Sequence, residues 1–296
     1  MALNTRSTYT QAWTAFTVFR RCLEFNVEQP ASAEQIAEFI GWLSLEGKAP
    51  ATIAAYIAGI SFWHKFKFAT DPTNHCLVRQ ILKGVRRIKR QPDSRAPIND
   101  VLFEKILTVL PTLVSSDYER QLFQAAMAIG YFGFLRVSEF TAAGKFDPEP
   151  PLLGADVIFK GRSEVLLSIR RSKNNQTGPP QVVVLPSSKN SNKPCPVRIL
   201  AGYKKARPPN GQSFLSHYDG SPLTRYQFQT MIKKAGEALG LEKRITAHSL
   251  RIGAATTAYS QAWPEATIMG AGRWRSAAYK RYIRVAPADS QRLTLM

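Results

Sequence analysis

The stretch AHSLRIGAATT, residues 247–257, places two residues capable of chemistry in an otherwise small and apolar segment. His248 and Arg251 are three positions apart, close to one helical turn, so both side chains are expected on one helix face. A histidine can exchange a proton near neutral pH, whereas an arginine is a permanent cation with several N–H donors. Two interpretations are open: a core histidine with a surface arginine, or a pair that serves a site.

Arg136 and Glu139 interrupt a second apolar stretch, AIGYFGFLRVSEF, which is predicted to be helical. One interpretation is a half-buried ion pair, because a lone buried guanidinium would be costly. The other makes Glu139 the residue that holds the Arg136 fork, so that it points at a phosphate oxygen. This stretch by itself favours the plain ion pair.

Lys173 and a C-terminal aromatic cluster add further residue types that can take part in catalysis. Lys173 ends a predicted strand and begins a polar turn, and it is either a solvated lysine or a general acid carried by a β-hairpin. The segment AGRWRSAAYKRYIR offers Trp274, Tyr279 and Tyr282. Aromatic residues at helical spacing are usually packing residues, so this cluster alone does not predict a site.

The elements that would position these residues divide into two predicted domains. Residues 1–90 show apolar residues at helical spacing, with Ser32 and Gln35 predicted as a capping box. Residues 91–100, QPDSRAPIND, break this pattern with two prolines and are the predicted linker.

Residues 101–296 are the predicted second domain. Helix-like stretches lie at 101–114, 119–143, 224–239, 247–260, 263–270 and about 275–286. Strand-like stretches lie at 155–161, 164–173 and 180–186, separated by Gly, Asn and Pro. The predicted fold class is mainly α, with a small antiparallel β-sheet in an α+β second domain.

The charge of the chain indicates its partner. Forty Lys and Arg residues against 21 Asp and Glu residues give a net charge of +19 and a pI of about 10.1. This composition favours a nucleic-acid partner, because a basic surface that neutralises phosphates releases counterions. A generally basic protein without such a partner is the plain alternative.

Two other classes are disfavoured by composition. There is no run of about 18 apolar residues, so no membrane span and no membrane partner are predicted. Three cysteines, Cys22, Cys76 and Cys195, lie far apart without a paired motif. They predict neither a metal site nor a disulfide framework, and they suit a reducing intracellular compartment.

The segment NHCLVRQILKGVRRIKRQ, residues 74–91, combines an apolar stripe with a strongly cationic face. The stripe of Leu77, Ile81, Leu82 and Val85 is predicted to pack in a core. The cationic side chains are predicted to bind DNA, mostly at phosphates: Arg79, Lys83, Arg86, Arg87, Lys89 and Arg90. A nuclear-targeting run is the competing interpretation of the same cluster.

Six residues taken in chain order resemble the active-site series of the tyrosine recombinases, the phage integrase family. They are Arg136, Lys173, His248, Arg251, Trp274 and Tyr282. The resemblance covers the whole chain. The motifs RRSK, HSLRIG, and RW followed by YIR look like the Cre branch, which has tryptophan where most relatives have a second histidine. The GRW…YIR ending is also similar to recombinases of DIRS-type retroelements, which are mobile elements.

The resemblance implies a site-specific recombinase that cuts and rejoins DNA through a 3′-phosphotyrosine intermediate, with no metal ion, ATP or other cofactor. Arg136 and Arg251 would hold the phosphate, with Trp274 donating its indole N–H. His248 would donate to the same phosphate or help to deprotonate the tyrosine, and Lys173 would protonate the departing 5′-oxygen. The implied assembly is a two-domain clamp on double-stranded DNA and a synaptic tetramer.

Tyr282 is the predicted nucleophile, because YIR resembles the segment that follows family nucleophiles. Trp274 precedes Tyr282 by eight residues and Tyr279 by five, whereas the family pattern has nine. The end of the chain, with Leu293, Leu295 and Met296, is expected to dock on a neighbouring protomer.

Two alternatives stay open beside the recombinase. One is a type IB topoisomerase, which shares the catalytic residues but acts as a monomer. The other is a catalytically inactive, domesticated integrase that only binds DNA, for which the eight-residue spacing gives some support. The expected compartment is the nucleus in a eukaryote and otherwise the cytoplasm or nucleoid, and the sequence does not predict the DNA target.

Overall fold

The computed structural model describes residues 3–88, 93–173, 175–209 and 211–284. It divides into two compact units, Met1–Asp93 and Ser94–Met296, and the boundary falls inside the predicted linker. Several residues with predicted roles lie outside the described residues: Lys89, Arg90, Leu293, Leu295 and Met296. The roles predicted for them stay predictions.

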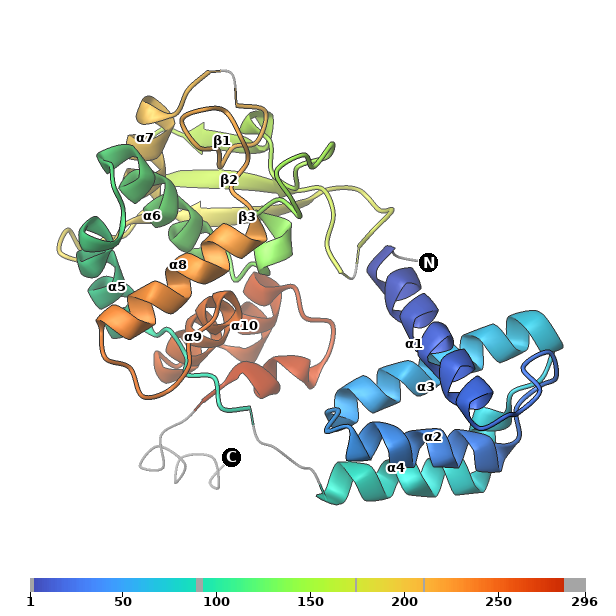
Figure 1. The fold of residues 1–296 in the computed structure, drawn as a ribbon. Coiled ribbons are helices and arrows are strands. Elements are labelled where there is room, and N and C mark those ends of the chain that lie inside the picture. Colours follow the sequence, from blue (N-terminus) through green and yellow to red (C-terminus); the bar gives the residue numbers. More distant parts are fainter. Residues whose placement is uncertain (1–2, 89–92, 174, 210, 285–296) are drawn as a thin grey trace. The chain divides into compact units, whose positions relative to one another are not determined.

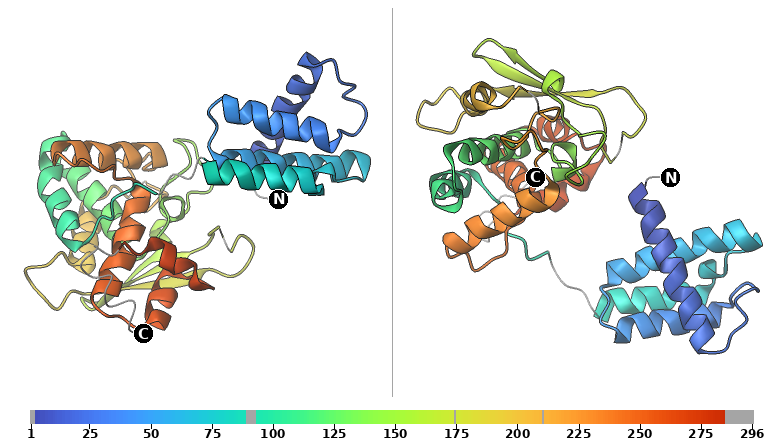
Figure 2. Two further views of the ribbon diagram at one scale, coloured as in Figure 1. Left: turned by 90° about the horizontal axis from the view of Figure 1, so that it is seen from below. Right: turned by 45° about the horizontal axis from the view of Figure 1, so that its top comes forward.

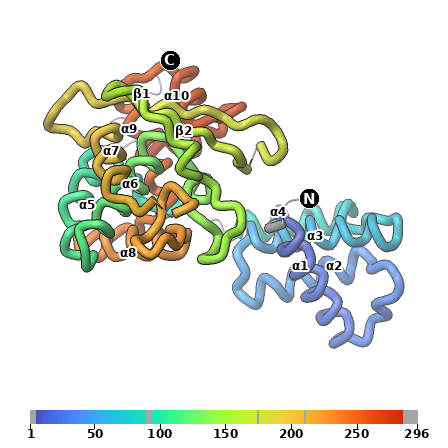
Figure 3. The backbone as a smooth tube through the Cα atoms, turned by 90° about the horizontal axis from the view of Figure 1, so that it is seen from above, coloured from blue at the N-terminus to red at the C-terminus, as the bar shows by residue number. Residues whose placement is uncertain are grey.

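The first unit is helical. It contains α1 (Leu3–Cys22), α2 (Ala33–Leu45), α3 (Pro50–Phe68) and α4 (Cys76–Ile88), with a short 3-10 turn at Pro72–Asn74. Figures 1 and 3 show these helices packed on one another. Their apolar faces meet in one core, where the rings of Phe16 and Phe39 lie 5.0 Å apart. The helical spacing of apolar residues therefore predicted this unit correctly.

The start of α2 differs in one respect from the prediction. Ser32 is the N-cap, and its side chain accepts a hydrogen bond from the Gln35 N–H at 3.3 Å. The reciprocal bond of the predicted capping box is not formed. The side-chain oxygen of Gln35 is buried without a hydrogen-bond partner in the described part of the chain, so it is turned away from the helix start.

Helix α4 separates its two faces as its sequence predicts. Ile81, Leu82 and Val85 pack against the core of the first unit as predicted. Leu77, the fourth residue of the predicted stripe, is partly exposed and is not among the residues of that core, where Val78 is fully buried instead. On the opposite face, the described cations are exposed: Arg79, Lys83, Arg86 and Arg87. The apolar stripe is therefore a packing surface, and the basic side chains are open to solvent.

The second unit contains most of the helices and the sheet. Its helices are α5 (Asp100–Leu113), α6 (Asp117–Phe132), α7 (Pro196–Ala206), α8 (Arg225–Ala238), α9 (Ala247–Ser260) and α10 (Glu265–Gly272). Short 3-10 helices are η2 (Val137–Glu139), η3 (Gly154–Asp156) and η4 (Ala277–Tyr282). Polar N-caps fix several helix starts by accepting backbone N–H bonds, as Asn99 does for α5 and Thr224 for α8.

The strands are β1 (Val157–Lys160), β2 (Glu164–Ile169) and β3 (Gln181–Pro186). Within the described residues they form one antiparallel sheet in the order β1-β2-β3. In the right-hand view of Figure 2 this sheet lies along one edge of the unit, with helices beside it. Val165, Leu167 and Ile169 alternate inward along β2, so the mainly helical fold with a small antiparallel sheet is confirmed.

A segment within the predicted linker packs directly on α9. The Ile98 N–H donates to the Ser249 carbonyl at 3.0 Å, and Ile98 is fully buried. A Cβ on Gly253 would lie 1.7 Å from the Ile98 carbonyl oxygen, so only glycine permits this approach. Gly253, from the HSLRIG motif, thus ties α9 to the chain that enters the second unit.

Two helices predicted near the site are shorter than expected. The helix predicted over 119–143 ends at Phe132, because the chain reverses through Gly133 and through Phe134, which has a φ of +49°. The helix predicted over about 275–286 is instead the 3-10 helix η4, capped by Ser276. Arg136 therefore lies at the start of the short 3-10 helix η2, and Tyr282 lies at the end of η4, instead of within long α-helices.

Candidate active site

Arg136 and Glu139 lie at the two ends of η2, directly after the reversal that ends α6. The Glu139 carboxylate accepts from the Arg136 backbone N–H at 2.9 Å and from Arg136 Nη1 at 3.1 Å. Glu139 is fully buried, while the Arg136 side chain keeps 20% of its surface exposed. The carboxylate thus holds the arginine by both its backbone and its side chain, and leaves the guanidinium partly open.

Arg273 is a second cation on the same carboxylate, and the sequence analysis did not identify it. Its Nη2 lies 2.5 Å from Glu139 Oε2, although 134 residues separate the two along the chain. The signal was present in the motif GRW, directly before Trp274, but nothing in the sequence connects that position to Glu139. Two guanidinium groups therefore share one buried carboxylate.

His248 and Arg251 lie in the first turns of α9, and both reach the Tyr282 ring. Arg251 is fully buried, and its guanidinium carbon lies 4.5 Å from the Trp274 ring centre and 5.5 Å from that of Tyr282. The ring centres of His248 and Tyr282 are 5.2 Å apart. The three-residue spacing on α9 thus presents both side chains to one tyrosine.

Backbone carbonyls hold the Arg251 guanidinium in place. One terminal nitrogen donates to the Phe134 carbonyl, and Nη2 donates to the Gly272 carbonyl at 2.6 Å. Burial, and secondly the nearby charge of Arg136, lowers the pKa of Arg251 to about 10. Arg251 therefore stays cationic at neutral pH, in a setting where its field is poorly screened.

Trp274 packs against both Arg251 and Tyr282. Its ring centre is 5.0 Å from that of Tyr282, so the eight-residue spacing still brings the two residues into contact. A Cβ on Gly272 would lie 1.8 Å from the Trp274 ring, so glycine is required beneath the indole. The Tyr282 carbonyl also accepts from the Thr256 hydroxyl at 3.2 Å, which fastens the tyrosine segment to α9.

Two N–H donors of this cluster are buried without an acceptor in the described part of the chain. They are the indole Nε1 of Trp274 and Nε of Arg251. Buried N–H groups are nearly always paired, so unpaired donors beside cations indicate a place for a missing acceptor. An oxyanion such as a phosphate satisfies both the donors and the positive charge.

Tyr279 has a different environment from Tyr282, three residues later. The residue is 1% exposed, and its hydroxyl interacts with the Glu265 carboxylate, whose pKa it lowers. Burial, and secondly Glu265, raises the pKa of Tyr279 to about 12. Tyr279 is thus built into the packing of η4 on α10, whereas Tyr282 is only half-buried and faces the cations.

Lys173 stands exposed in a tight turn between Ser172 and Asn175. In the described residues, no contact joins it to Arg136, Arg251 or Tyr282. The structure therefore brings together five of the six residues in the predicted catalytic series, and leaves Lys173 at the surface.

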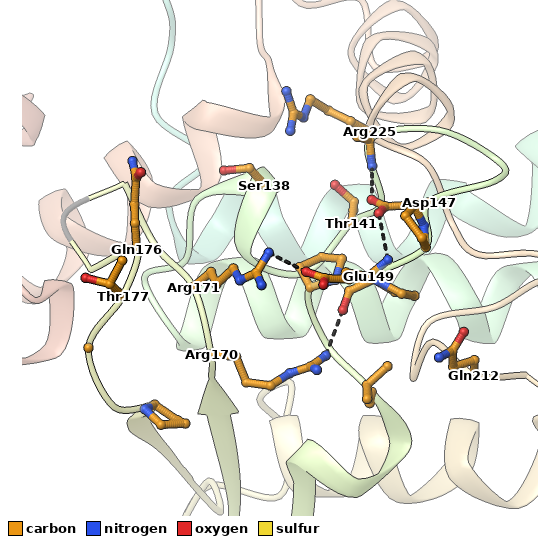
Figure 4. A pocket seen from close by; sticks show the side chains of 17 residues that line it. Ser138, Thr141, Asp147, Glu149, Arg170, Arg171, Gln176, Thr177, Gln212 and Arg225 are labelled. Carbon is orange, nitrogen blue, oxygen red and sulfur yellow. Dashed lines mark hydrogen bonds and ion pairs between the residues drawn. The ribbon is translucent and has the colours of Figure 1, made fainter. Parts of the chain in front are cut away.

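A groove of about 800 Å³ lies between η2 and the β2–β3 connection, and its lining includes none of the residues of the predicted catalytic series. Figure 4 shows Ser138 of η2 on one side and Gln176 and Thr177 of the β2–β3 connection on another. Arg170, just before the turn, is held by Asp156 at 3.0 Å. The segments that flank Lys173 thus line a groove that begins at the residue next to Glu139.

The described ranges contain neither a group of metal ligands nor a membrane-spanning helix. No group of three or more His, Cys, Asp or Glu side chains in those ranges could hold a metal ion. No helix there has the length and apolar character needed to cross a membrane.

Comparisons with known proteins show which family and fold this chain resembles. Residues 162–288 match the model of the phage integrase family. Tyrosine recombinase XerD of Listeria monocytogenes serovar 1/2a is 29% identical over 231 residues, which make up 75% of this chain and 67% of that protein.

Two solved structures are similar in fold over nearly the whole chain. One is the XerH site-specific recombinase bound to a palindromic difH substrate after cleavage, with a TM-score of 0.68, 16% identity, and coverage of 98% of this chain and 78% of that one. The other is a lambda integrase tetramer bound to a Holliday junction, with a TM-score of 0.68, 17% identity, and coverage of 96% and 72%. The predicted family resemblance is confirmed.

Proposed function

We propose that this chain, which carries a phage integrase family domain over residues 162–288, is a site-specific DNA recombinase that cuts and rejoins strands through a covalent bond to Tyr282. One observation carries the proposal: the Tyr282 ring lies against His248, Trp274 and Arg251, with centres 5.0–5.5 Å away. A tyrosine among cations and unpaired donors can attack a phosphodiester, whose developing charge those groups stabilise.

The reaction proceeds in two transesterifications. The Tyr282 oxygen attacks the scissile phosphorus, its proton passes to His248, and the bond from phosphorus to the 5′-oxygen breaks. Lys173 gives a proton to the departing 5′-oxygen, so a 3′-phosphotyrosine and a free 5′-hydroxyl result. A 5′-hydroxyl from a partner strand then attacks the phosphotyrosine and releases Tyr282. The phosphoester energy is conserved, and no ATP is consumed.

The transition state carries extra negative charge on a five-coordinate phosphorus. Arg136 offers a partly open fork, held by Glu139, to the non-bridging oxygens. Arg251 and Trp274 offer their buried, unpaired N–H groups. Donors fixed before the reaction stabilise this charge without reorganising, and they can do so without a metal ion.

Lys173 acts from an exposed position in this proposal. The residues on both sides of its turn line the groove next to η2, which is where the proposal places the DNA strand that Lys173 serves. Its exposure in the DNA-free chain suits a general acid that is positioned by DNA.

The remaining assignments follow from charge and resemblance. Residues 1–90 are proposed as the helical DNA-binding domain, 91–100 as the linker and 101–296 as the catalytic domain. The partner is double-stranded DNA, on which the chain assembles into a synaptic tetramer, as lambda integrase does on a Holliday junction. The site of action is the compartment that holds this DNA.

The test is covalent trapping on nicked duplex suicide substrates, without metal or ATP, read on denaturing gels. Because the target is unknown, a random-sequence pool and supercoiled DNA serve as substrates. Wild type is expected to form a covalent band, Tyr279→Phe to retain it and Tyr282→Phe to lose it. Loss with Tyr279→Phe alone would name the other tyrosine as the nucleophile.

The two alternatives give different results in the same experiment. A type IB topoisomerase would relax supercoiled DNA as a monomer, without joining two duplexes. An inactive integrase would give no covalent band while retaining tight, salt-sensitive binding. Filled catalytic positions and unpaired buried donors disfavour the inactive form, since a dead enzyme has no physical reason to keep them.

A further inference from the structure

Arg273 occupies a backbone conformation that disfavours its own residue type. It ends α10 in the left-handed region, with a φ of +53°. Glycine adopts this conformation freely, whereas every residue with a Cβ is strained there. A side chain retained at such a position suggests that the side chain itself has a role.

The side chain of Arg273 ends on one anion. Its Nη2 lies 2.5 Å from Glu139 Oε2, and the two side chains are only 11% and 1% exposed. Its other terminal nitrogen, Nη1, is buried without an acceptor in the described part of the chain. Glu139 is therefore the anion with which the Arg273 guanidinium pairs.

The same carboxylate also holds Arg136, and this sharing sets the charge of the site. If Arg136 were the one cation on Glu139, the carboxylate would cancel its charge. With Arg273 as a second cation, the trio keeps one net positive charge, and Arg251 adds another. Little solvent screens these groups, so a single charge has a large effect.

We propose that Arg273 is a positioning residue of the recombination site, which acts through Glu139. It neutralises the carboxylate, so that Arg136 is held in place by Glu139 and still presents its charge to the scissile phosphate. This inference rests on the proposed function. It assigns Arg273 to the arrangement of the site and gives it no contact with the DNA.

Variants of Arg273 and Glu139 distinguish an effect of the Arg273 charge from a purely structural role of its side chain. Arg273→Ala leaves Glu139 to neutralise Arg136, and covalent-complex formation at saturating DNA should slow by roughly 10- to 100-fold. Arg273→Lys keeps the charge and should recover most of the rate. Arg273→Gly relieves the backbone but removes the cation, so it should be as slow as Arg273→Ala.

The decisive variant is Glu139→Gln in the Arg273→Ala background. It removes the unbalanced carboxylate, so the double variant should form the covalent complex faster than Arg273→Ala alone. A double variant that is as slow as Arg273→Ala, or slower, would mean that Arg273 is only a structural brace. A wild-type rate for Arg273→Ala would also overturn the proposal. The matched control is Arg275→Ala, an exposed arginine two residues later that should leave the rate at saturation unchanged.

A second readout needs no DNA cleavage. Orthovanadate is a tetrahedral analogue of phosphate that becomes five-coordinate when an oxygen nucleophile adds to it. Its binding to the chain without DNA can be measured by calorimetry. Arg273→Ala should weaken this binding about tenfold or more, and the added Glu139→Gln should restore it. If wild type forms no covalent complex, the proposed function fails. The comparison of vanadate affinity between wild type and Arg273→Ala then still tests the role of Arg273. Equal vanadate affinity in wild type and Arg273→Ala, or no binding by either, contradicts the inference.

Discussion

Two groups of cations in this chain are arranged in opposite ways. Around Glu139 and Tyr282, three arginines are buried or nearly so and are held by hydrogen bonds: Arg136, Arg251 and Arg273. On α4, the described basic side chains are exposed to solvent: Arg79, Lys83, Arg86 and Arg87. The first group is fixed in a poorly screened setting, and the second is open to solvent and screened by salt.

The difference indicates separate tasks for the two groups. Fixed, desolvated donors can recognise one phosphate and the charge that develops on it. Exposed cations meet many phosphates in many geometries, which supplies affinity and salt dependence but little catalysis. The following predictions test this division, from the largest expected effect to the smallest.

Arg251→Ala should break the buried cluster most severely. Loss of one fixed donor to a transition-state oxyanion costs about a hundred- to a thousandfold in rate. The rate of covalent-complex formation at saturating DNA should fall by this factor, while DNA affinity changes far less. Arg87→Ala on α4 is the matched control. An equal loss of rate in both variants would refute the division.

Trp274→Phe should have an intermediate effect. Phenylalanine keeps an aromatic ring against Arg251 but lacks the buried indole N–H, and one neutral hydrogen bond is worth about tenfold in rate. Single-turnover cleavage should slow by about this factor. Trp42→Phe, which changes a half-exposed indole of the first unit, should cleave as wild type does. A wild-type rate for Trp274→Phe would mean that the indole N–H does not donate to the scissile phosphate.

Neutralising α4 should weaken binding and leave the chemistry intact. In Arg86→Ala/Arg87→Ala, the slope of log affinity against log salt should fall by about 0.9 for each lost phosphate contact. The cleavage rate at saturating DNA should stay that of wild type. Affinity measured by fluorescence anisotropy at several salt concentrations tests this. An unchanged slope would mean that this face of α4 does not meet DNA.

The two units should also respond to pH in opposite directions. In the first unit, His64 accepts from the Ala31 N–H at 3.1 Å, and burial lowers its pKa below the usual 6.5. As the pH falls, His64 is protonated in the unfolded chain before it is protonated in the folded chain. The contribution of neutral His64 to the stability of the fold is therefore present above pH 6.5 and is lost as the pH falls below it. The loss is at most about 1.4 kcal/mol per pH unit.

In the second unit, the pKa of His217 is shifted in the opposite direction. Its Nδ1 lies 2.8 Å from the Glu119 carboxylate, and that bond raises the pKa of His217. The stability that this bond contributes is full below pH 6.5 and is lost as the pH rises through the raised pKa of His217.

The prediction for His64 can be measured at the amide that it accepts from. Amide exchange of Ala31 should accelerate as the pH falls from 7.5 to 5.5, after correction for intrinsic rates, and His64→Gln should remove this dependence. Unchanged protection of Ala31 would contradict the assignment.

Local patterns predicted the helices of the first unit, the three strands and the two faces of α4, because periodicity and burial are properties of neighbouring residues. They failed where the chain reverses. Gly133 and Phe134 end α6 early, and nothing in the apolar run AIGYFGFL marks that point strongly. The predicted capping bond of Gln35 is also not formed, and its side-chain oxygen is buried without a partner in the described residues.

The sequence by itself determined which chemical groups are available: the series of arginines, the histidine, the tryptophan and the tyrosine, with the glycines that let them approach. Only the tertiary structure decided how they meet. It placed Arg273 on Glu139 across 134 residues, buried Tyr279, and left Tyr282 facing Arg251. Spacing along a chain limits contacts within one helix, whereas contacts between distant segments depend on the whole packed core.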